Sequence, residues 1–596
     1  MKKLLGVILS LTLLVTGVSG CAANKESTQA PDSGNAAANA VSVSYDSDDY
    51  YFDWKNSSYK TISLSRNTAA VKGDGIAVQG SLVTISASGI YEITGTMADG
   101  SIVVDINKEI DSNTVFLVLN GANITSRTSA PIYIKGAKKV AILLENGTDN
   151  SVTAGSGAVV NEDGEPSAAV FSKADLTITG SGTLTVKADY NDGITGKDDL
   201  KITDGTLIID SKADGIVGKD SLIIKNGNIT VTAGKDGLRS TNETDEGKGN
   251  IVIQSGQFAV TAANDCLQAV KILQIDDGKI NLNSGGGYPG KSIGNGNNFG
   301  GRPGQANTTA TSNTESSEES KKGLKAGQEI LINGGDINVS AYEDAVHSNS
   351  NITINAGILT LQSGDDGIHA ENKVLIENGE ITVKNSYEGL EGSNITVNGG
   401  KINTVSSDDG FNINSNSGVL NINGGEIAMN ANGDGLDSNG SIKMTGGTVY
   451  VDGPISNNNG ALDYNSSFSI SGGTLVASGS SGMAEAPSNN TQPSILMNYS
   501  SVQAAASTIT LRDKDGNTVI TFTPSKQYSS VVISSPQLSV GSAYTLYSGD
   551  SKIIDFTLSD SLIYLLESGV TTKQQNGGGG PNGGGSMMPR NGARPQ

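Results

Sequence analysis

The chain is poor in cysteine, aromatic residues and positive charge. Its 596 residues include two Cys, one Trp and two His, and aromatic side chains make up 5% of the sequence. Lys and Arg number 40 against 61 Asp and Glu, which gives a formal net charge of −21. This balance argues against nucleic acid as a partner, because phosphate binding requires basic patches. It also opposes direct binding of a polyanion, unless a cation bridges the two.

No helical period is sustained anywhere, whereas glycine is abundant. The 78 Gly and 13 Pro fit a chain of short strands joined by tight turns, because glycine accepts positive φ without steric cost.

The first 21 residues have the features of an export signal. Met1-Lys2-Lys3 is a basic start, and the apolar stretch from Leu4 to Val15 is too short for a membrane span. The following Val18-Ser19-Gly20-Cys21 resembles a bacterial lipobox, in which the cysteine carries a lipid after cleavage. We therefore predict an extracellular monomer that is lipid-anchored to the cell membrane through Cys21 alone. Only Cys266 would remain as a thiol, so no intrachain disulfide can form.

An Asp-Gly-aliphatic triplet recurs along the chain at a fixed interval. It begins at Asp192, Asp214 and Asp236, which are 22 residues apart (214−192 and 236−214), and the interval returns between Asp344 and Asp366. Related triplets begin at Asp265, Glu388, Asp409 and Asp434.

Each repeat holds about three short segments that alternate apolar and polar residues, such as Leu207-Ile208-Ile209. A strand this short cannot bury its apolar face alone, but stacked coils can. We therefore predict an all-β protein built as a right-handed parallel β-helix, with about 22 residues and three strands per coil and a small β-rich C-terminal cap.

Composition suggests how the rest of the chain is divided. Residues 22–44 predict a flexible linker, and residues 45–499 predict the β-helix, interrupted by a low-complexity insertion at 284–325. The aromatic stretch 45–59 is expected to cover the first coil, because an open coil edge promotes aggregation.

The C-terminal part differs in pattern. Residues 500–570 predict the β-rich module, with a hairpin turn at Asp515-Gly516-Asn517, and residues 571–596 predict a Gly-rich disordered tail.

With these features the chain resembles the bacterial carbohydrate-binding parallel β-helix lipoproteins, over most of residues 60–570. The resemblance rests on the repeated Asp-Gly-Ile triplets, on the Asn-Gly-Gly turns at Asn398 and Asn423, and on the segment from Tyr528 to Pro536. It implies a fold similar to that of pectate lyases, and binding of calcium and of acidic polysaccharides such as polygalacturonate.

Residues one repeat apart stack in a β-helix, so the acidic residues form columns. Like charges one strand spacing apart repel by about 1 kcal/mol or more, which a bound cation would relieve. Ca²⁺ requires 6–8 oxygen ligands, and carboxylates, turn carbonyls and water supply them. We predict Ca²⁺ ligands at Asp192, Asp214, Asp236, Glu343, Asp344, Asp365, Asp366, Glu388, Asp408 and Asp409. Alternatively, each Asp accepts a backbone N–H in its own turn.

A second column follows three residues after the first. We predict that it contacts the substrate through Arg239, His347, His369 and Glu391. Zinc bound by the two histidines and Glu391 is an alternative, but the sequence shows no groups that would orient such ligands. The histidines are therefore expected to be solvent-facing polar positions beside the carboxylates.

The predicted function is binding of acidic polysaccharide at the cell surface through Ca²⁺. A second hypothesis is a calcium-dependent polysaccharide lyase, in which Lys197, Lys219 or Arg239 would act as the base. A third is a structural surface adhesin. The acidic residues at 343–409 lie far in sequence from those bases, which favours binding without catalysis.

Overall fold

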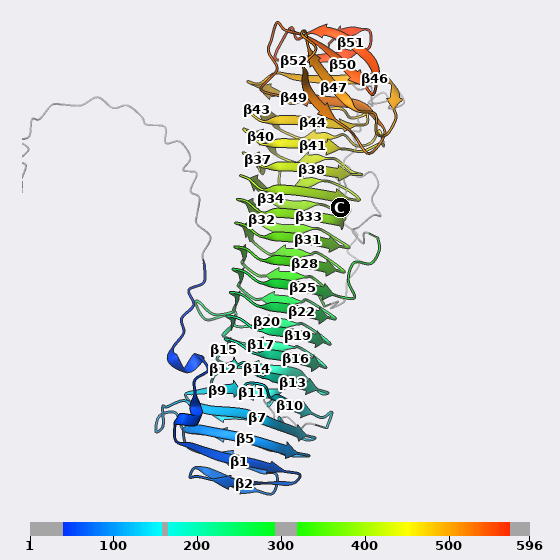
Figure 1. The fold of residues 1–596 in the computed structure, drawn as a ribbon. Helices are drawn as coiled ribbons and strands as arrows, with labels where there is room; N and C mark the ends of the chain where they lie inside the picture. The colour runs from blue at the N-terminus through cyan, green and yellow to red at the C-terminus, as the bar shows by residue number, and fades with distance from the viewer. Residues whose placement is uncertain (1–39, 158–164, 292–318, 573–596) are drawn as a thin grey trace, which may run out of the picture. The chain divides into compact units, whose positions relative to one another are not determined.

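The computed structural model describes residues 40–157, 165–291 and 319–572. They form a parallel β-solenoid of about 14 turns that is almost entirely β-structure (Figure 1). The predicted all-β parallel β-helix is therefore confirmed. Cys21, the expected leader, most of the linker and nearly all of the tail lie outside the described residues. Within the described ranges, no helix has the length and hydropathy needed to cross a bilayer.

Three parallel sheets run along the solenoid, and each coil contributes one strand to each sheet. The first sheet contains β10 (Asp149–Ala154), β13 (Thr183–Ala188), β16 (Thr206–Ser211), β19 (Asn228–Ala233), β22 (Gln257–Ala262), β25 (Lys279–Ser284), β28 (Asp336–Ala341), β31 (Ile358–Ser363), β33 (Glu380–Ser386), β35 (Lys401–Ser406), β38 (Glu426–Ala431), β41 (Thr448–Asp452) and β44 (Thr474–Gly479).

The second sheet follows the Asp-Gly-aliphatic triplets. It contains β4 (Leu82–Ile85), β6 (Ser101–Asp105), β8 (Ile132–Gly136), β11 (Ala168–Ser172), β14 (Asp192–Gly196), β17 (Ile216–Gly218), β20 (Leu238–Ser240), β23 (Leu267–Ala269), β26 (Leu324–Ala326), β29 (Val346–Ser348), β32 (Ile368–Ile376), β34 (Leu390–Val397), β36 (Phe411–Ile413), β39 (Leu436–Ser438) and β42 (Leu462–Tyr464).

The third sheet closes each coil, and β32 and β34 are long enough to continue into it. Its other strands are β1 (Tyr59–Ser65), β5 (Gly89–Met97), β7 (Val115–Ser126), β9 (Lys139–Leu144), β12 (Asp175–Gly180), β15 (Asp199–Ile202), β18 (Ser221–Ile224), β21 (Asn250–Ile253), β24 (Ile272–Ile275), β27 (Glu329–Ile332), β30 (Asn351–Ile354), β37 (Val419–Ile422), β40 (Ser441–Met444), β43 (Ser467–Ile470) and β45 (Asn489–Asn490).

The register explains why the 22-residue repeat specifies the fold. Ile194 pairs with Ile216, and Ile216 pairs with Leu238, so residues one repeat apart lie directly above one another. The step from Leu238 to Leu267 is longer, and its extra residues lie in the turn between β20 and β21. Apolar residues from all three sheets point inward and form one continuous core cluster.

Two β-rich regions adjoin the ends of the coils. Near the start, β2 (Thr68–Lys72) pairs with β1 and β3 (Ile76–Gln79) pairs with β4, both antiparallel. At the last coil, the antiparallel strand β49 (Tyr528–Ser534) pairs with β44 and with β46 (Ser494–Gln503), and β46 also pairs with β52 (Leu562–Leu566). The hairpin strand β53 (Gly569–Thr571) pairs with β52.

A separate four-stranded sheet completes the C-terminal module. Its strands are β47 (Ile509–Asp513), β48 (Thr518–Phe522), β50 (Ala543–Ser548) and β51 (Ser551–Thr557). The hairpin between β47 and β48 turns at Gly516, whose φ is 86°. Phe522 stacks on Tyr450 of β41 with ring centroids 5.1 Å apart, which joins this sheet to the solenoid.

The aromatic N-terminal stretch does not cover the first coil, contrary to the expectation. With its short helices η1 (Ser47–Asp49) and η2 (Trp54–Asn56), it lies along the outer face of the third sheet. Tyr45 donates to Gln254 at 2.9 Å, whereas the Trp54 indole donates to Glu145 at 2.7 Å, so the stretch crosses several coils. The physical reason is that this face carries outward apolar residues on which Trp54 packs: Val118, Ala141 and Leu143.

If the stacked inward-facing residues stabilise the solenoid, shortening a side chain should lower the free energy of unfolding strongly only at inward-facing positions. Ile381→Ala in β33 removes a fully buried side chain and should lower the free energy of unfolding by about 2–5 kcal/mol. Ile358→Ala in β31 alters a side chain that is 51% exposed and should change it by less than about 1 kcal/mol. Urea unfolding of both variants measures the difference, and equal effects would contradict the core assignment.

Candidate functional site

A column of mainly acidic residues stands where each turn enters the second sheet. We call it the ladder column. It consists of Asp192, Asp214, Asp236, Asp265, Lys322, Asp344, Asp366, Glu388, Asp409 and Asp434. Its members occupy one position per coil, so stacking brings together residues that are far apart in the sequence.

One carboxylate oxygen of a ladder Asp accepts the backbone N–H of the ladder residue in the next coil. Asp214 Oδ1 accepts from the Asp236 N–H at 3.1 Å, and Asp366 Oδ1 accepts from the Glu388 N–H at 3.2 Å. The same bond recurs along the column between consecutive coils. The sequence left open that each Asp accepts a backbone N–H in its own turn. In the structure these carboxylates accept a backbone N–H from the next coil. The second oxygen is left for other partners.

The glycine after the ladder Asp is required by close packing. A Cβ on Gly215 would lie 2.5 Å from the Gly237 carbonyl oxygen of the next coil, which is too close for any side chain. Its φ is not positive, so here the Asp-Gly pair reports the approach of two coils rather than a left-handed turn.

A second column, which we call the flanking column, lies three residues after the ladder column along the chain. Its side chains determine which groups contact the second oxygen of each ladder carboxylate. Its members are Thr195, Val217, Arg239, Gln268, Lys325, His347, His369, Glu391, Asn412, Asp437 and Asp463. From Arg239 to Asp463, this series changes from basic side chains through two histidines to acidic ones.

In the lower coils the flanking column supplies cations. Arg239 lies 3.1 Å from Asp214 Oδ2 and 3.5 Å from Asp236 Oδ2, and Lys325 lies 3.2 Å from Asp265 Oδ2. The structure thus brings Asp214 and Asp236 together with Arg239, as the sequence placed them, so one protein cation serves two carboxylates. Burial and the charge of Asp214 still raise the pKa of Asp236 to about 7.

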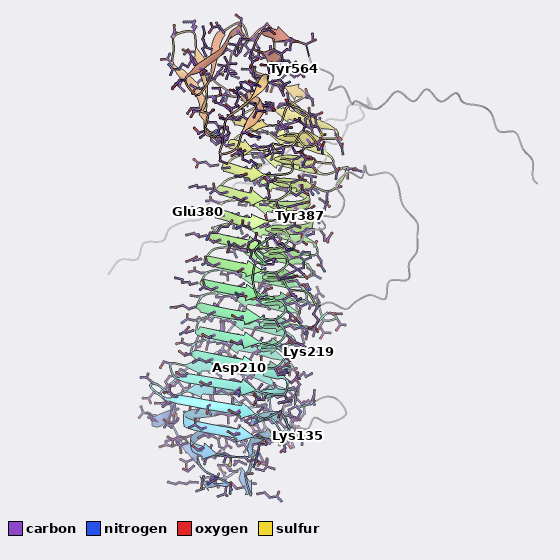
Figure 2. The ribbon with its side chains drawn as sticks, turned by 90° about the vertical axis from the view of Figure 1, so that its right-hand side faces the viewer. Lys135, Asp210, Lys219, Glu380, Tyr387 and Tyr564 are labelled. Carbon is purple, nitrogen blue, oxygen red and sulfur yellow. The ribbon has the colours of Figure 1, made fainter. Side chains whose placement is uncertain are left out.

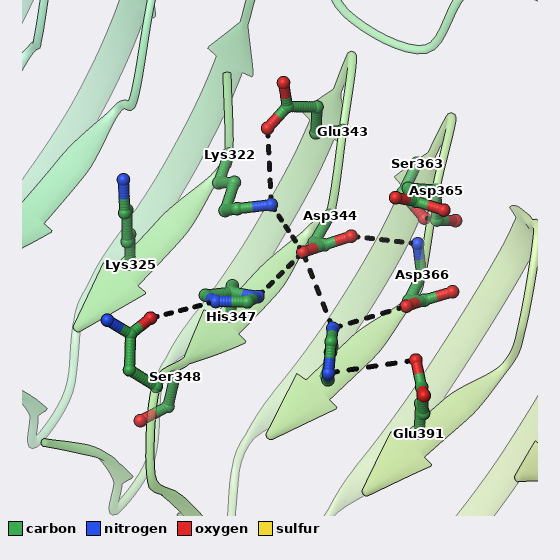
Figure 3. A network of polar contacts seen from close by, with 12 residues as sticks. Lys322, Lys325, Glu343, Asp344, His347, Ser348, Ser363, Asp365, Asp366 and Glu391 are labelled. Atoms are coloured by element: carbon green, nitrogen blue, oxygen red, sulfur yellow. Dashed lines mark hydrogen bonds and ion pairs between the residues drawn. The ribbon is translucent and has the colours of Figure 1, made fainter. Parts of the chain in front are cut away.

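Lys322 interrupts the ladder column and was not identified from the sequence. Its Nζ lies 2.6 Å from Asp344 Oδ2 and 3.2 Å from Glu343 Oε2 (Figure 3). Burial alone would raise the pKa of Asp344, but the hydrogen bond from His347 and the charge of Lys322 outweigh it and lower that pKa. A protein cation therefore occupies the patch where we expected Ca²⁺ on Glu343 and Asp344.

The sequence does contain a pattern that identifies the position of Lys322. Lys322-Gly323-Leu324 is a ladder triplet with Lys in place of Asp, and it lies inside the segment 284–325 that we expected to be inserted. Since β26 begins at Leu324, the structure places these residues in the solenoid.

The two histidines stack one coil apart, with ring centroids 4.9 Å from each other. His347 Nδ1 lies 2.8 Å from Asp344 Oδ2, and His369 Nδ1 lies 3.4 Å from Asp366 Oδ2. Both side chains are largely buried, at 11% and 17% exposed. The expectation that they face solvent is therefore wrong, because their rings turn toward the carboxylates of the ladder column.

In the upper coils both columns are mainly acidic, with Asn412 as the exception in the flanking column. Together with Asp408, which precedes the ladder residue Asp409, the acidic residues are Glu388, Glu391, Asp408, Asp409, Asp434, Asp437 and Asp463. Within the described ranges, no Lys or Arg forms an ion pair with any of them. The nearest hydrogen-bond donors include the amide of Asn412, whose Nδ2 donates to Glu388 Oε2 at 2.8 Å.

Burial and mutual repulsion raise the pKa values of several of these carboxyl groups. Burial and the charge of Asp463 raise the pKa of both Asp434 and Asp437 to about 7. Burial and the charge of Asp437 raise the pKa of Asp409 well above its ordinary value, and burial and Glu391 do the same for Glu388. Negative charge without a counter-ion is therefore concentrated in these coils.

Asp434, Asp437 and Asp463 are arranged as cation ligands. Each can offer one carboxylate oxygen such that the three oxygens lie within 4.8 Å of one another, and all three side chains are half-buried. Three carboxylates supply up to six oxygens, which together with water meets the requirement of Ca²⁺. Asp434 begins a recognised triplet of the repeat, but none of these three residues was included in the predicted ligand set.

The basic residues that a lyase would need lie elsewhere. Lys197 lies 3.6 Å from Glu165 and near the ring of Phe171, and Lys219 is exposed. In Figure 2, Lys219 is several coils away from Tyr387, which precedes Glu388. The structure therefore does not bring these bases to the upper acidic coils.

Fold and site together define a class: a parallel β-solenoid with one edge of stacked, partly uncompensated carboxylates. The family model of carbohydrate-binding domain-containing proteins matches residues 79–367 and 365–519, and the chain belongs to this family.

Two further similarities were found. A carbohydrate-binding domain-containing protein of Acetivibrio thermocellus is 45% identical over 138 residues, which is 23% of this chain and 47% of the relative. The match therefore spans about half the length of that relative. The polysaccharide lyase-like protein from C. thermocellum, solved as a gadolinium derivative, is 31% identical, with 47% of this chain and 94% of that chain covered and a TM-score of 0.35.

The raised pKa values predict how stability depends on pH when divalent cations are removed. For Asp434 and Asp437 the folded pKa of about 7 exceeds the unfolded value of about 4. Their contribution is therefore fully present below pH ~4 and is lost as the pH rises to about 7. In EDTA, the melting temperature should be several degrees higher at pH 5.5 than at pH 8.

A matched pair of variants tests the origin of this effect. Asp437→Asn should flatten the pH dependence, whereas Asp550→Asn, at an exposed turn, should leave it unchanged. A melting temperature that rises with pH in EDTA, or equal behaviour of both variants, would refute the assignment.

Proposed function

We propose that this protein is exported, lipid-anchored through Cys21, and binds acidic polysaccharide of the polygalacturonate type through Ca²⁺. The single observation that carries the proposal is the run of paired acidic columns in the upper coils, which within the described residues no lysine or arginine neutralises. Membership of a carbohydrate-binding family supports a polysaccharide as the partner.

The chemistry of the ligand set supports Ca²⁺ at this place. Asp434, Asp437 and Asp463 offer only oxygen, and hard divalent cations prefer such ligands. Binding would deprotonate the carboxyl groups with raised pKa and replace their repulsion by attraction to one ion. The lower coils have less need of an ion, because Arg239, Lys322 and Lys325 already pair with the ladder carboxylates.

An acidic polymer is the partner that requires such an ion most. A chain of net charge −21 repels a polyuronate, so attraction must come from cations held at its surface. A half-buried Ca²⁺ with open coordination positions can accept a sugar carboxylate from solution. Repetition of acidic positions along the solenoid suits a polymer, which offers one carboxylate after another.

Location at the cell surface is proposed from the leader alone. The basic start, the short apolar stretch and the Val18–Cys21 segment favour export followed by lipid attachment.

Binding is tested by retention on immobilised polygalacturonate. The full chain should be retained in millimolar Ca²⁺ and released by EDTA. Asp463→Asn should weaken Ca²⁺-dependent retention at least tenfold, because it removes a ligand without adding a positive charge. Asp550→Asn is the control and should bind as the wild type. Retention that persists in EDTA would overturn the calcium bridge, and no retention in Ca²⁺ would overturn the choice of polymer.

The lyase hypothesis is tested on the same mixture. Elimination creates an unsaturated uronate, whose ultraviolet absorbance would increase with time. We expect no increase, because Arg239 is bound to Asp214 and Asp236, and Lys197 and Lys219 lie several coils from the upper acidic residues. A calcium-dependent increase that Arg239→Gln abolishes would establish catalysis in the lower coils.

A further inference from the structure

His369 lies at the boundary between the coils that contain protein cations and the coils that do not. Below it in the flanking column is His347, and above it is Glu391. His369 Nδ1 faces two ladder carboxylates, at 3.4 Å from Asp366 Oδ2 and 4.0 Å from Asp344 Oδ2. The ring is thus held between acidic side chains on both of its edges.

The other nitrogen of this ring has no hydrogen-bond partner. His369 Nε2 is buried, and its nearest acidic atom is Glu391 Oε2 at 3.8 Å. That separation is too long for a hydrogen bond. It is close to the distance between two ligands of one tetrahedral ion, since atoms that are each 2.0–2.1 Å from zinc lie about 3.4 Å apart.

A second buried atom without a partner belongs to Asn412. Asn412 stacks on Glu391 in the following coil, and its Nδ2 donates to Glu388. Its Oδ1 is buried and accepts no hydrogen bond. The residues before and after Glu391 in the flanking column, His369 and Asn412, therefore each have a buried atom without a hydrogen-bond partner.

His347, in the same column, has a hydrogen-bond partner for each of its ring nitrogens. Its Nδ1 lies 2.8 Å from Asp344 Oδ2, and its Nε2 lies 3.1 Å from Asn349 Oδ1. Both of its nitrogens have partners, so His347 has no free ligand atom. The difference between these two neighbours locates the unusual chemistry at His369.

We propose that Asp366, His369 and Glu391 form a binding site for a first-row divalent transition metal of the zinc type. These residues can each supply one ligand atom, and those atoms lie within 4.8 Å of one another. Nε2 is assigned as the histidine ligand because it is buried without a hydrogen-bond partner, and Asp366 and Glu391 supply one carboxylate oxygen each. The Asn412 Oδ1 or water completes the coordination.

The site differs in chemistry from the Ca²⁺ cluster of the proposed function. Imidazole nitrogen is a ligand for zinc, copper, nickel and iron, whereas calcium takes oxygen. The Ca²⁺ cluster uses Asp434, Asp437 and Asp463, which share no residue with this site. The two ions therefore should not compete, and each can be removed by its own substitution.

The test is calorimetric titration of the untagged full chain with Zn²⁺, first without other divalent cations and then in excess Ca²⁺. One zinc ion per chain should bind. His369→Gln and Glu391→Gln should each weaken zinc affinity at least tenfold, whereas His347→Gln should change it by less than threefold. Asp463→Asn should leave zinc affinity unchanged while it weakens Ca²⁺ binding, so failure of the proposed function and failure of this inference are distinguishable.

Histidine-selective ¹⁵N spectra give an independent measure, because the chain has only two histidines. Zinc should shift the Nε2 resonance of His369 much more than either nitrogen of His347. Absence of zinc binding by the wild type overturns the site. So does affinity that is unaffected by His369→Gln, or reduced equally by His347→Gln, in variants whose circular dichroism matches that of the wild type.

Discussion

The hydrogen bond from the backbone N–H of one coil to a ladder carboxylate of the preceding coil is the constraint on which the acidic edge depends. It fixes the carboxylate at the entry to each strand of the second sheet, and it uses one oxygen only. A carboxylate fixed in this way is half-buried or buried, which makes its charge expensive unless a partner is nearby. The stacking that builds the solenoid therefore also places, in most coils, a buried carboxylate whose ionised form needs a nearby positive charge for stabilisation.

The flanking column meets this demand in different ways along the solenoid. Arg239 and Lys325 reach the ladder from the flank, and Lys322 enters the ladder itself. Histidines stand at the next two steps, and beyond them the flank is acidic or an amide. Because the backbone is nearly the same in every coil, the identity of one side chain per coil decides whether the protein or a bound ion supplies the charge.

The fold was predictable because its information is periodic. The 22-residue interval sets the register, and the register alone places Asp214 above Asp192 and below Asp236. The charge balance of the acidic positions was harder to predict, since the repeat identifies positions but not which of them have a cationic partner. Lys322 follows Asp265 after a long insertion and lacks the acidic residue by which the triplet was recognised. Burial of His369 and the missing partner of its Nε2 depend on three neighbouring coils, and no local motif encodes them.

The pattern of pKa values also bears on the choice between a binder and an enzyme. Acid–base catalysis by two carboxyl groups requires environments that push their pKa values apart, so that one donates a proton while the other accepts it. In the upper coils the same two causes, burial and like charge, raise the pKa of Glu388, Asp409, Asp434 and Asp437 together. Groups that are shifted in one direction by their mutual repulsion respond alike to a shared cation. Among the described residues, Glu388, Asp409, Asp434 and Asp437 are therefore suited to binding a shared cation.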